Sequence, residues 1–287
     1  MSSQFARVAV LFAGFSVTLI AAAVSSAQGT NPNFQVGKEQ QQEMNQQLEE
    51  KQLSKVSNPP PVKVDPKEEA AYKAFFNTPQ QDVEKKIQLG QDFVQRYPSS
   101  VYAEAVHSAV AKAYYTKQDW KDFFSESDKA LALNHDDVDM LTMVGWVIPH
   151  TVTESEPDAD AQLDKAEADE KHAVDIIGTM PKPATMTDDQ FAALKTAKLA
   201  EAHSGLGLTY FRRHDYDKSA KELQQATEGN PNPDPLDLFA LGASLQNSGH
   251  YNDASDAFNR CAQMAGSLQA PCKQNADNAK KLAAQQK

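Results

Sequence analysis

After residue 65, short apolar runs at helical spacing alternate with polar segments that carry helix start and stop signals. Asp65 before Pro66 is typical of a helix start, because proline is tolerated at the first helical position. Residues 187–190 form a capping-box sequence, and Pro149 is expected to end a helix because proline lacks an N–H donor. The predicted helical segments are 66–76, 78–97, 104–135 (a hairpin), 139–148, 161–177, 188–213, 235–265 (a hairpin) and 271–285.

The stretch from residue 200 to 265 contains one helical hairpin written twice, as 200–231 and 235–265. A glycine inside a helix costs about 1 kcal/mol relative to alanine, so Gly207 and Gly242 predict two close helix crossings. In the predicted helix 161–177, Ala166 and Ala173 are seven residues apart, as Ser219 and Ala226 are in the first copy of the hairpin. The matched positions are Leu206-Gly207 with Leu241-Gly242, Tyr210 with Leu245, Tyr216 with Tyr251, Ser219 with Ala254, Leu223 with Phe258, and Ala226 with Cys261.

These residues resemble the tetratricopeptide-repeat (TPR) family, whose period is about 34 residues. The resemblance implies an all-α fold, an α-solenoid of about four TPR-like helical hairpins over residues 66–287 with a C-terminal capping helix. Aromatic residues after the turns, Trp120, Tyr216 and Tyr251, are then expected to wedge between hairpins. Residues 93–100 also resemble the hairpin ends of TPR proteins from the bacterial cell envelope.

The first 65 residues are not expected to belong to this fold. Residues 1–27 combine Arg7, an apolar run over 8–24 and small residues before Gln28, which predicts a secretory signal peptide cleaved after Ala27. A retained membrane anchor is the alternative, since the run is at the short limit for a span. Residues 28–65, rich in glutamine and then proline, are expected to be a disordered linker. The mature chain is therefore expected to be periplasmic or secreted.

The formal net charge of −11 disfavours two classes of partner. A strongly acidic protein repels nucleic acid and anionic lipid at long range. We therefore expect no nucleic-acid partner and no membrane insertion once the leader is removed.

The sequence contains no pattern that predicts an enzyme, a cofactor or a metal site. Zinc-helix, nucleophile-elbow and phosphate-loop motifs are all missing from it. The acidic segment 154–160 does not match a calcium loop, which requires a glycine at its sixth position. Asp169 and His172, three residues apart, are interpreted as a surface pair. Cys261 and Cys272 are expected to form a disulfide in an exported chain, although a buried free thiol at Cys261 is the alternative.

The resemblance also implies a concave groove lined by the first helix of each hairpin. Large apolar groups among its residues, Trp146, Leu208 and Phe211, favour a binding surface. A cover formed by the residues before Ala200 is the alternative. The candidate groove residues are Lys112, Tyr115, Thr116, Thr142, Trp146, Ser204, Leu208, Phe211, Arg212, Phe239, Gln246 and Asn247.

The pattern as a whole predicts a non-enzymatic protein–protein interaction module of the cell envelope. A protein or peptide segment of unknown identity would bind in the groove. The alternative is a structural spacer that forms a homo-oligomer through the glutamine-rich segment 39–53.

Overall fold

The computed structural model describes residues 64–153, 155–230 and 232–286, and within them it contains helices and no strands. The predicted leader and almost all of the predicted linker lie outside these residues. The helices are α3 (Pro66–Phe76), α4 (Val83–Arg96), α5 (Ala103–Lys117), α6 (Trp120–Leu133), α7 (Val138–Thr151), α8 (Ala159–Thr179), α9 (Asp188–Arg212), α10 (Tyr216–Thr227), α11 (Pro235–Asn247), α12 (Tyr251–Ala262) and α13 (Gln269–Gln285).

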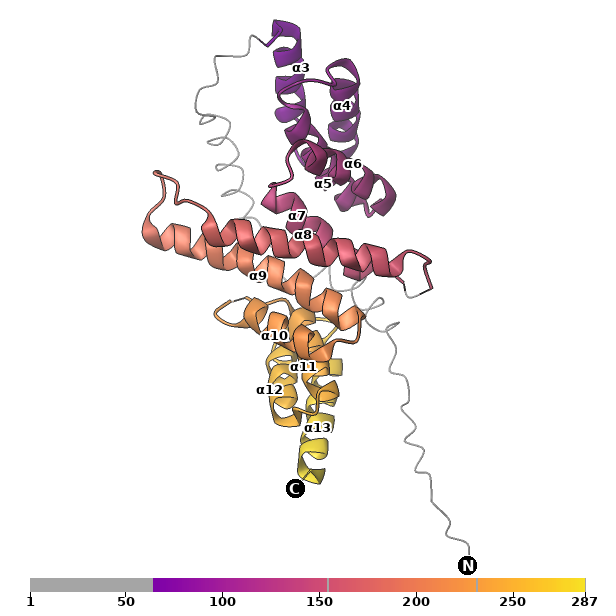
Figure 1. Cartoon of the computed structure of the whole chain (residues 1–287), viewed down its shortest axis with the longest axis vertical. Helices are drawn as coiled ribbons and strands as arrows, with labels where there is room; N and C mark the ends of the chain where they lie inside the picture. The colour runs from indigo at the N-terminus through magenta and orange to yellow at the C-terminus, as the bar shows by residue number, and fades with distance from the viewer. Residues whose placement is uncertain (1–63, 154, 231, 287) are drawn as a thin grey trace, which may run out of the picture.

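Consecutive helices pack as hairpins, and the hairpins stack along the long axis of the molecule (Figure 1). The described residues form five hairpins, from α3/α4 to α11/α12, and α13 packs on α12. The first helices of successive hairpins also contact one another, α7 with α9 and α9 with α11. The predicted all-α solenoid is therefore confirmed. The long helices α8 and α9 lie across the middle of the stack (Figure 1).

Helix start signals placed most boundaries correctly, but not that of α4. Asp65 accepts a hydrogen bond from the Lys67 N–H at 2.7 Å, as an N-cap should. Thr187 and Gln190 form both bonds of the capping box. The prediction that a second helix begins at residue 78 is wrong, because α4 begins at Val83. The Thr78 hydroxyl donates back to the Ala74 carbonyl at 2.9 Å and so extends the end of α3.

The prediction that Pro149 ends its helix is also wrong. Pro149 lies inside α7, which continues to Thr151. Proline removes only its own N–H donor, and the regular pattern resumes when the Val152 N–H donates to the Ile148 carbonyl at 2.9 Å. The three extra residues, 149–151, place His150 on the same helix as Trp146, which matters for the site described below.

Glycines in the first helices allow close approach, as the repeat predicts. A Cβ added at Gly207 would lie 2.7 Å from Cδ2 of Leu223, and one at Gly242 would lie 2.7 Å from Cδ1 of Phe258. Gly145 of α7 has the same role, but its neighbour is Glu170, whose Cδ would lie 2.6 Å from the added atom. A carboxylate side chain thus occupies the place that leucine and phenylalanine hold in the later hairpins.

Two hairpins share a further pattern that the sequence analysis did not detect. Nδ1 of His107 in α5 lies 2.6 Å from Oε2 of Glu126 in α6, and Nδ1 of His203 in α9 lies 2.7 Å from Oε2 of Glu222 in α10. Both pairs are separated by 19 residues, so α5/α6 and α9/α10 are equivalent hairpins. The turns of hairpins α5/α6, α9/α10 and α11/α12 also agree, because each contains one residue with a positive φ angle. These residues are Gln118, His214 and Gly249.

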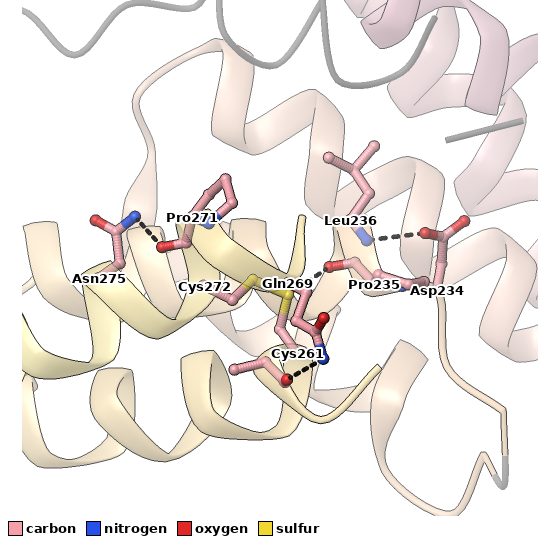
Figure 2. The surroundings of a disulfide bond; sticks show 9 residues. Asp234, Pro235, Leu236, Cys261, Gln269, Pro271, Cys272 and Asn275 are labelled. Carbon is pink, nitrogen blue, oxygen red and sulfur yellow. Dashed lines mark hydrogen bonds between the residues drawn. A yellow bond between two sulfur atoms is a disulfide. The ribbon is translucent and has the colours of Figure 1, made fainter. Parts of the chain in front are cut away.

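The last helix closes the end of the stack. Cys261 of α12 and Cys272 of α13 form the predicted disulfide, with their Cα atoms 5.8 Å apart (Figure 2). Both cysteines are fully buried. Ala276 and Ala279 of α13 pack against Phe258, and small side chains there let the two helices lie close together. The predicted capping helix is therefore confirmed.

Candidate partner-binding surface

The predicted groove residues lie on the first helices α5, α7, α9 and α11, and an aromatic group joins the two halves of the stack. Trp146 of α7 is half-buried and packs against the core formed by α3 to α8 and against the core formed by α9 to α13. Its ring lies 6.4 Å from that of Tyr115 in α5. It also stacks on His150 with ring centroids 3.8 Å apart. Tyr115, Trp146 and His150 therefore form a continuous aromatic row, which we call the inner aromatic row.

Arg212 extends this row from α7 to α9. Its Nε donates a hydrogen bond of 2.6 Å to the Pro149 carbonyl, and the neighbouring Phe211 packs edge-on against Tyr216 at 5.9 Å. Phe211 and Arg212 are half-buried, so part of each side chain remains accessible. The arginine thus links α9 to the end of α7, at a carbonyl that the proline-containing last turn exposes.

His150 belongs to this surface but was missed by the sequence analysis. Burial lowers its pKa to about 4, a hydrogen bond with the Trp146 carbonyl opposes this, and the Arg212 charge lowers the pKa further. The imidazole is therefore neutral near pH 7. Its Nε2 atom is buried and has no hydrogen-bond partner among the described residues. The spacing of four residues from Trp146 could have indicated a shared helix face. The expected helix end at Pro149, however, placed His150 outside the helix.

Leu208 does not lie in an open groove, and the prediction that it is an exposed anchor is wrong. Its side chain is 6% exposed and packs with Leu223 and Leu241 in the core of the last hairpins. Thr142 and Ser204 are buried as well. Ser204 donates a hydrogen bond of 2.7 Å to Asp237, so it joins α9 to α11. These three positions are buried within the stack and are not available to a partner.

The remaining predicted residues are accessible to different degrees. Phe239 packs edge-on against Phe258 at 5.7 Å and is half-buried between α11 and α12. Gln246 is half-buried, and its Oε1 atom has no partner among the described residues. Lys112 is half-buried on α5, whereas Thr116 and Asn247 are exposed. The predicted residues therefore fall into a central group around Trp146 and an outer group on α5 and α11.

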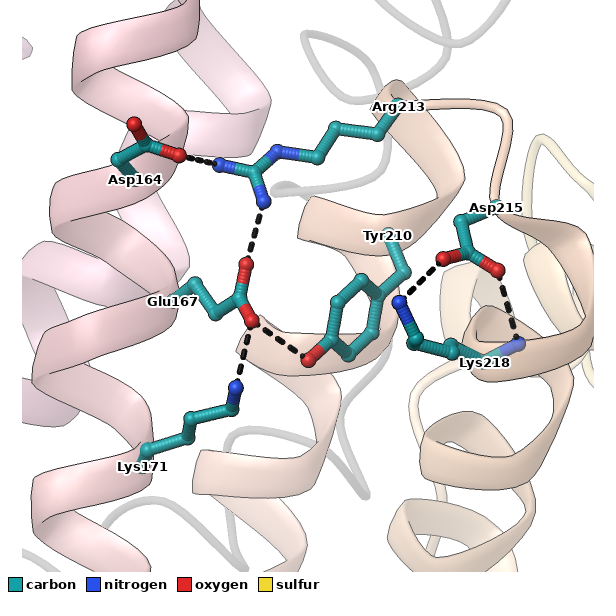
Figure 3. A network of polar contacts seen from close by, with 7 residues as sticks. All are labelled: Asp164, Glu167, Lys171, Tyr210, Arg213, Asp215 and Lys218. Carbon is teal, nitrogen blue, oxygen red and sulfur yellow. Dashed lines mark hydrogen bonds and ion pairs between the residues drawn. The ribbon is translucent and has the colours of Figure 1, made fainter.

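A pocket of 630 Å³ opens beside Arg212, between α8 and the turn from α9 to α10. Arg213 forms ion pairs with Asp164 and Glu167 of α8, and the Tyr210 hydroxyl donates to Glu167 at 2.9 Å (Figure 3). Burial would raise the pKa of Glu167, but hydrogen bonds from Lys171 and Tyr210 and the nearby cationic charges lower it overall. The network holds one wall of the pocket in place. The pocket residues are Val152, Thr153, Ala159, Asp160, Leu163, Asp164, Arg212, Arg213 and His214.

The acidic segment near this pocket gives no support to a calcium site. Asp158 and Asp160 are exposed on the start of α8, and the described residues do not bring them together with a third ligand. Asp169 and His172, interpreted as a surface pair, each have a different hydrogen-bond partner. Asp169 pairs with Lys165 at 2.9 Å, and His172 turns to Asp136 at 2.8 Å.

The stacked hairpins, their glycine crossings and the left-handed turn residues define a tetratricopeptide-repeat fold. No family model matches the chain, and no curated protein matches it in sequence. Among solved structures, the chain is similar to PilW, described as a widely conserved type IV pilus biogenesis factor. The TM-score is 0.51 at 14% sequence identity, over 77% of this chain and 93% of PilW. At this identity the likeness concerns the fold.

Two further solved structures are named as TPR proteins. TTC0263 from Thermus thermophilus is 13% identical, with a TM-score of 0.45 over 74% of this chain and 98% of that chain. A protein from Parabacteroides merdae is 11% identical, with a TM-score of 0.37 over 76% of this chain and 92% of that one. Within the residues described, none of the helices from α3 to α13 combines the length and hydropathy needed to cross a bilayer.

Proposed function

We propose that the protein is a non-enzymatic interaction module that binds a segment of a partner protein along the inner aromatic row. The observation that carries this proposal is Trp146, which remains partly accessible while it bridges the cores of the two halves of the stack. Aromatic residues and arginine that are fixed by their neighbours are typical of interface hot spots. Tyr115, His150 and Arg212 surround it with such groups.

The chemistry of this surface favours a segment that is apolar and carries hydrogen-bond donors. Because Nδ1 of the neutral His150 donates to the Trp146 carbonyl, its Nε2 atom is an acceptor. Gln246 contributes an acceptor whose Oε1 has no partner among the residues described. Both atoms are buried in the free protein, so a partner's donor would reach them only if the side chains around Trp146 rearrange on binding. We include Tyr115, Trp146, Phe211, Arg212 and Gln246 in the proposed site, with Lys112, Phe239 and Asn247 at its edges.

Site-specific photo-crosslinking tests the location of binding before the partner is known. A photoreactive amino acid at the exposed positions Thr116 and Asn247 is expected to capture the same partner from an envelope extract. Matched probes at Lys121 and Gln225, exposed positions on the second helices α6 and α10, should not capture it. Capture from Lys121 or Gln225 alone would place the interface on the other face and contradict the proposal.

Replacing Trp146 with alanine is expected to weaken binding of the captured partner by about thirtyfold or more, since central hot-spot residues often contribute about 2 kcal/mol or more. The purified partner would be titrated by fluorescence anisotropy. Phe191→Ala is the matched control, because Phe191 is a half-buried aromatic residue at the opposite end of α9 from Arg212. Equal affinity of the Trp146→Ala variant and the unchanged protein, both folded by circular dichroism, would exclude Trp146 as an anchor.

We propose that this module acts outside the cytoplasm, as a periplasmic or secreted protein. The buried disulfide supports the proposal, because such bonds persist in oxidising compartments. PilW, whose fold is similar, is described as a pilus biogenesis factor. The leader itself and the glutamine-rich segment of the spacer alternative lie outside the described residues. Comparing the mass in solution of residues 28–287 and 65–287 tests that alternative, which requires an oligomer that truncation abolishes.

A further inference from the structure

We propose that His135, Asp136 and His172 form a binding site for a divalent transition-metal ion of the zinc class. His135 and Asp136 lie in the connection between α6 and α7, and His172 lies on α8. Nε2 of His135 lies 3.3 Å from Oδ1 of Asp136, and Nε2 of His172 lies 2.8 Å from the same oxygen. One ligand atom from each residue lies within 4.8 Å of the other two. Two imidazole nitrogens and a carboxylate oxygen therefore converge on one point of the surface.

The spacing of these atoms fits a metal ion. Zinc binds histidine nitrogen and carboxylate oxygen at about 2.0–2.2 Å, so ligand atoms in its tetrahedral geometry lie about 3.3–3.6 Å apart. The 3.3 Å distance from His135 to Asp136 falls in this range, and the 2.8 Å distance from His172 would lengthen by about 0.5 Å when an ion replaces that hydrogen bond. The two imidazole rings are nearly parallel, with an interplanar angle of 8° and centroids 5.9 Å apart, so both can present Nε2 to the same side. Imidazole ligands favour zinc, copper and nickel over calcium or magnesium.

The backbone around the three residues is already ordered without a metal. His172 is held by the regular hydrogen bonds of α8. The Asp136 N–H donates to Oδ1 of Asn134 at 3.2 Å, and the next residue, Asp137, caps α7 by accepting from the Met140 N–H. Binding would therefore order side chains rather than a loop. The side chains are 83%, 52% and 42% exposed for His135, Asp136 and His172, so an ion can reach them and water can complete its coordination.

Neighbouring acidic residues are not part of the proposed ligand set. Lys165 pairs with both Asp128 and Asp169, at 3.6 Å and 2.9 Å. The proposed ligand set is therefore the Asp136 carboxylate and the two imidazoles of His135 and His172. Because each histidine must supply an unprotonated Nε2, an ion competes with protons for the site, and binding should weaken as the pH is lowered. A bound ion would connect the end of hairpin α5/α6 to α8 in the next hairpin.

Zinc titration of the chain without an affinity tag tests the proposal. Binding would be measured by calorimetry and by competition with a chromogenic chelator, under non-reducing conditions because both cysteines are bonded. We expect one equivalent of Zn²⁺ to bind. His135→Gln and His172→Gln are each expected to weaken binding by at least about tenfold, the loss that even an outer-shell change commonly causes. His250→Gln is the matched control, since His250 is exposed and lies in the distant turn before α12.

Melting temperatures provide a second measurement. Zn²⁺ should raise the melting temperature of the unchanged protein and of His250→Gln, and not that of His172→Gln. Ca²⁺ should raise none of them. Circular dichroism without metal checks that each variant folds, and Asp136→Asn replaces any variant that does not. Zinc affinity that survives the combined His135→Gln and His172→Gln changes, or no saturable binding to the unchanged protein, would overturn the site.

Discussion

Replacing both Cys261 and Cys272 with alanine is expected to lower the free energy of unfolding by about 3 kcal/mol, the value that loop-closure entropy gives for a separation of 11 residues. The disulfide fastens the start of α13 to α12, and α13 covers the apolar side of the last hairpin with Ala276 and Ala279. Without the bond, this terminal helix should open before the rest of the stack. Urea unfolding followed by circular dichroism measures the loss.

Alanine is a conservative choice at these positions, because Ala226 occupies the place of Cys261 in the preceding repeat. The unchanged protein in excess reductant should therefore unfold at the same urea concentration as the double variant. The double variant should not respond to reductant. Hydrogen exchange should be fastest in α13 in both cases. An effect of reductant on the double variant would show that reductant acts on something other than this bond. Equal stability of the unchanged protein and the double variant, each with and without reductant, would contradict a structural role for the bond.

The hairpins were predictable because their determinants are local. A glycine, a turn and an aromatic residue recur at fixed spacing, and each has a direct physical reason within a single hairpin. The contacts of Gly207 with Leu223 and of Gly242 with Phe258 are the same contact repeated. Helix ends were less certain, because a single side-chain bond such as that of Thr78 to Ala74 decides where a turn continues.

The surface was harder to predict because it depends on how successive hairpins meet. Leu208 has the repeat position of a groove residue, but the packing of α11 and α12 buries it. His135, Asp136 and His172 come together across 36 residues of sequence, a separation that no local motif spans. Arg212 was predicted as a groove residue, whereas its bond to the Pro149 carbonyl required the unexpected last turn of α7.

Glu170 is the position where the repeat pattern and the chemistry conflict. It falls between Ala166 and Ala173, as Leu223 falls between Ser219 and Ala226, so the spacing alone places it at a core position. Its side chain is fully buried, and neither carboxylate oxygen has a hydrogen-bond partner among the residues described. It lies against Gly145 of α7 and Gly205 of α9, and a Cβ added at either glycine would lie 2.6 Å from its Cδ. Two hairpins therefore close around one carboxyl group.

Glu170→Gln is expected to stabilise the protein at pH 8 by roughly 2–3 kcal/mol, because an ionised carboxylate is costly to bury without partners. Burial raises the pKa of Glu170 well above 4.5, and the charges of Glu201 and Asp169 raise it further. Since the folded state holds the Glu170 proton more tightly, the contribution of this group to stability is fully present below pH 4.5 and is lost as the pH rises toward the folded pKa. Glutamine keeps the shape and cannot ionise, so the gain should be small near pH 4.5 and grow with pH. Urea unfolding at several pH values measures it.

Glu167→Gln is the matched control, because Glu167 lies one turn earlier on α8 and its pKa is shifted in the opposite direction. Its ion pairs with Lys171 and Arg213 lower that pKa, so they stabilise the folded state above about pH 4.5 and are lost as the pH falls through the folded value. Removing them should destabilise the protein at pH 8 and have little effect in acid. Other buried acids, such as Glu104 with a pKa of about 7, remain in every variant, so the difference between two variants isolates the changed residue. A Glu170→Gln gain that does not vary between pH 5 and 8 would show that Glu170 binds equally many protons in the folded and unfolded states, so the buried carboxyl would already be ionised and its pKa would not be raised. A loss of stability at pH 8 would mean that the carboxylate has a partner that the amide cannot replace.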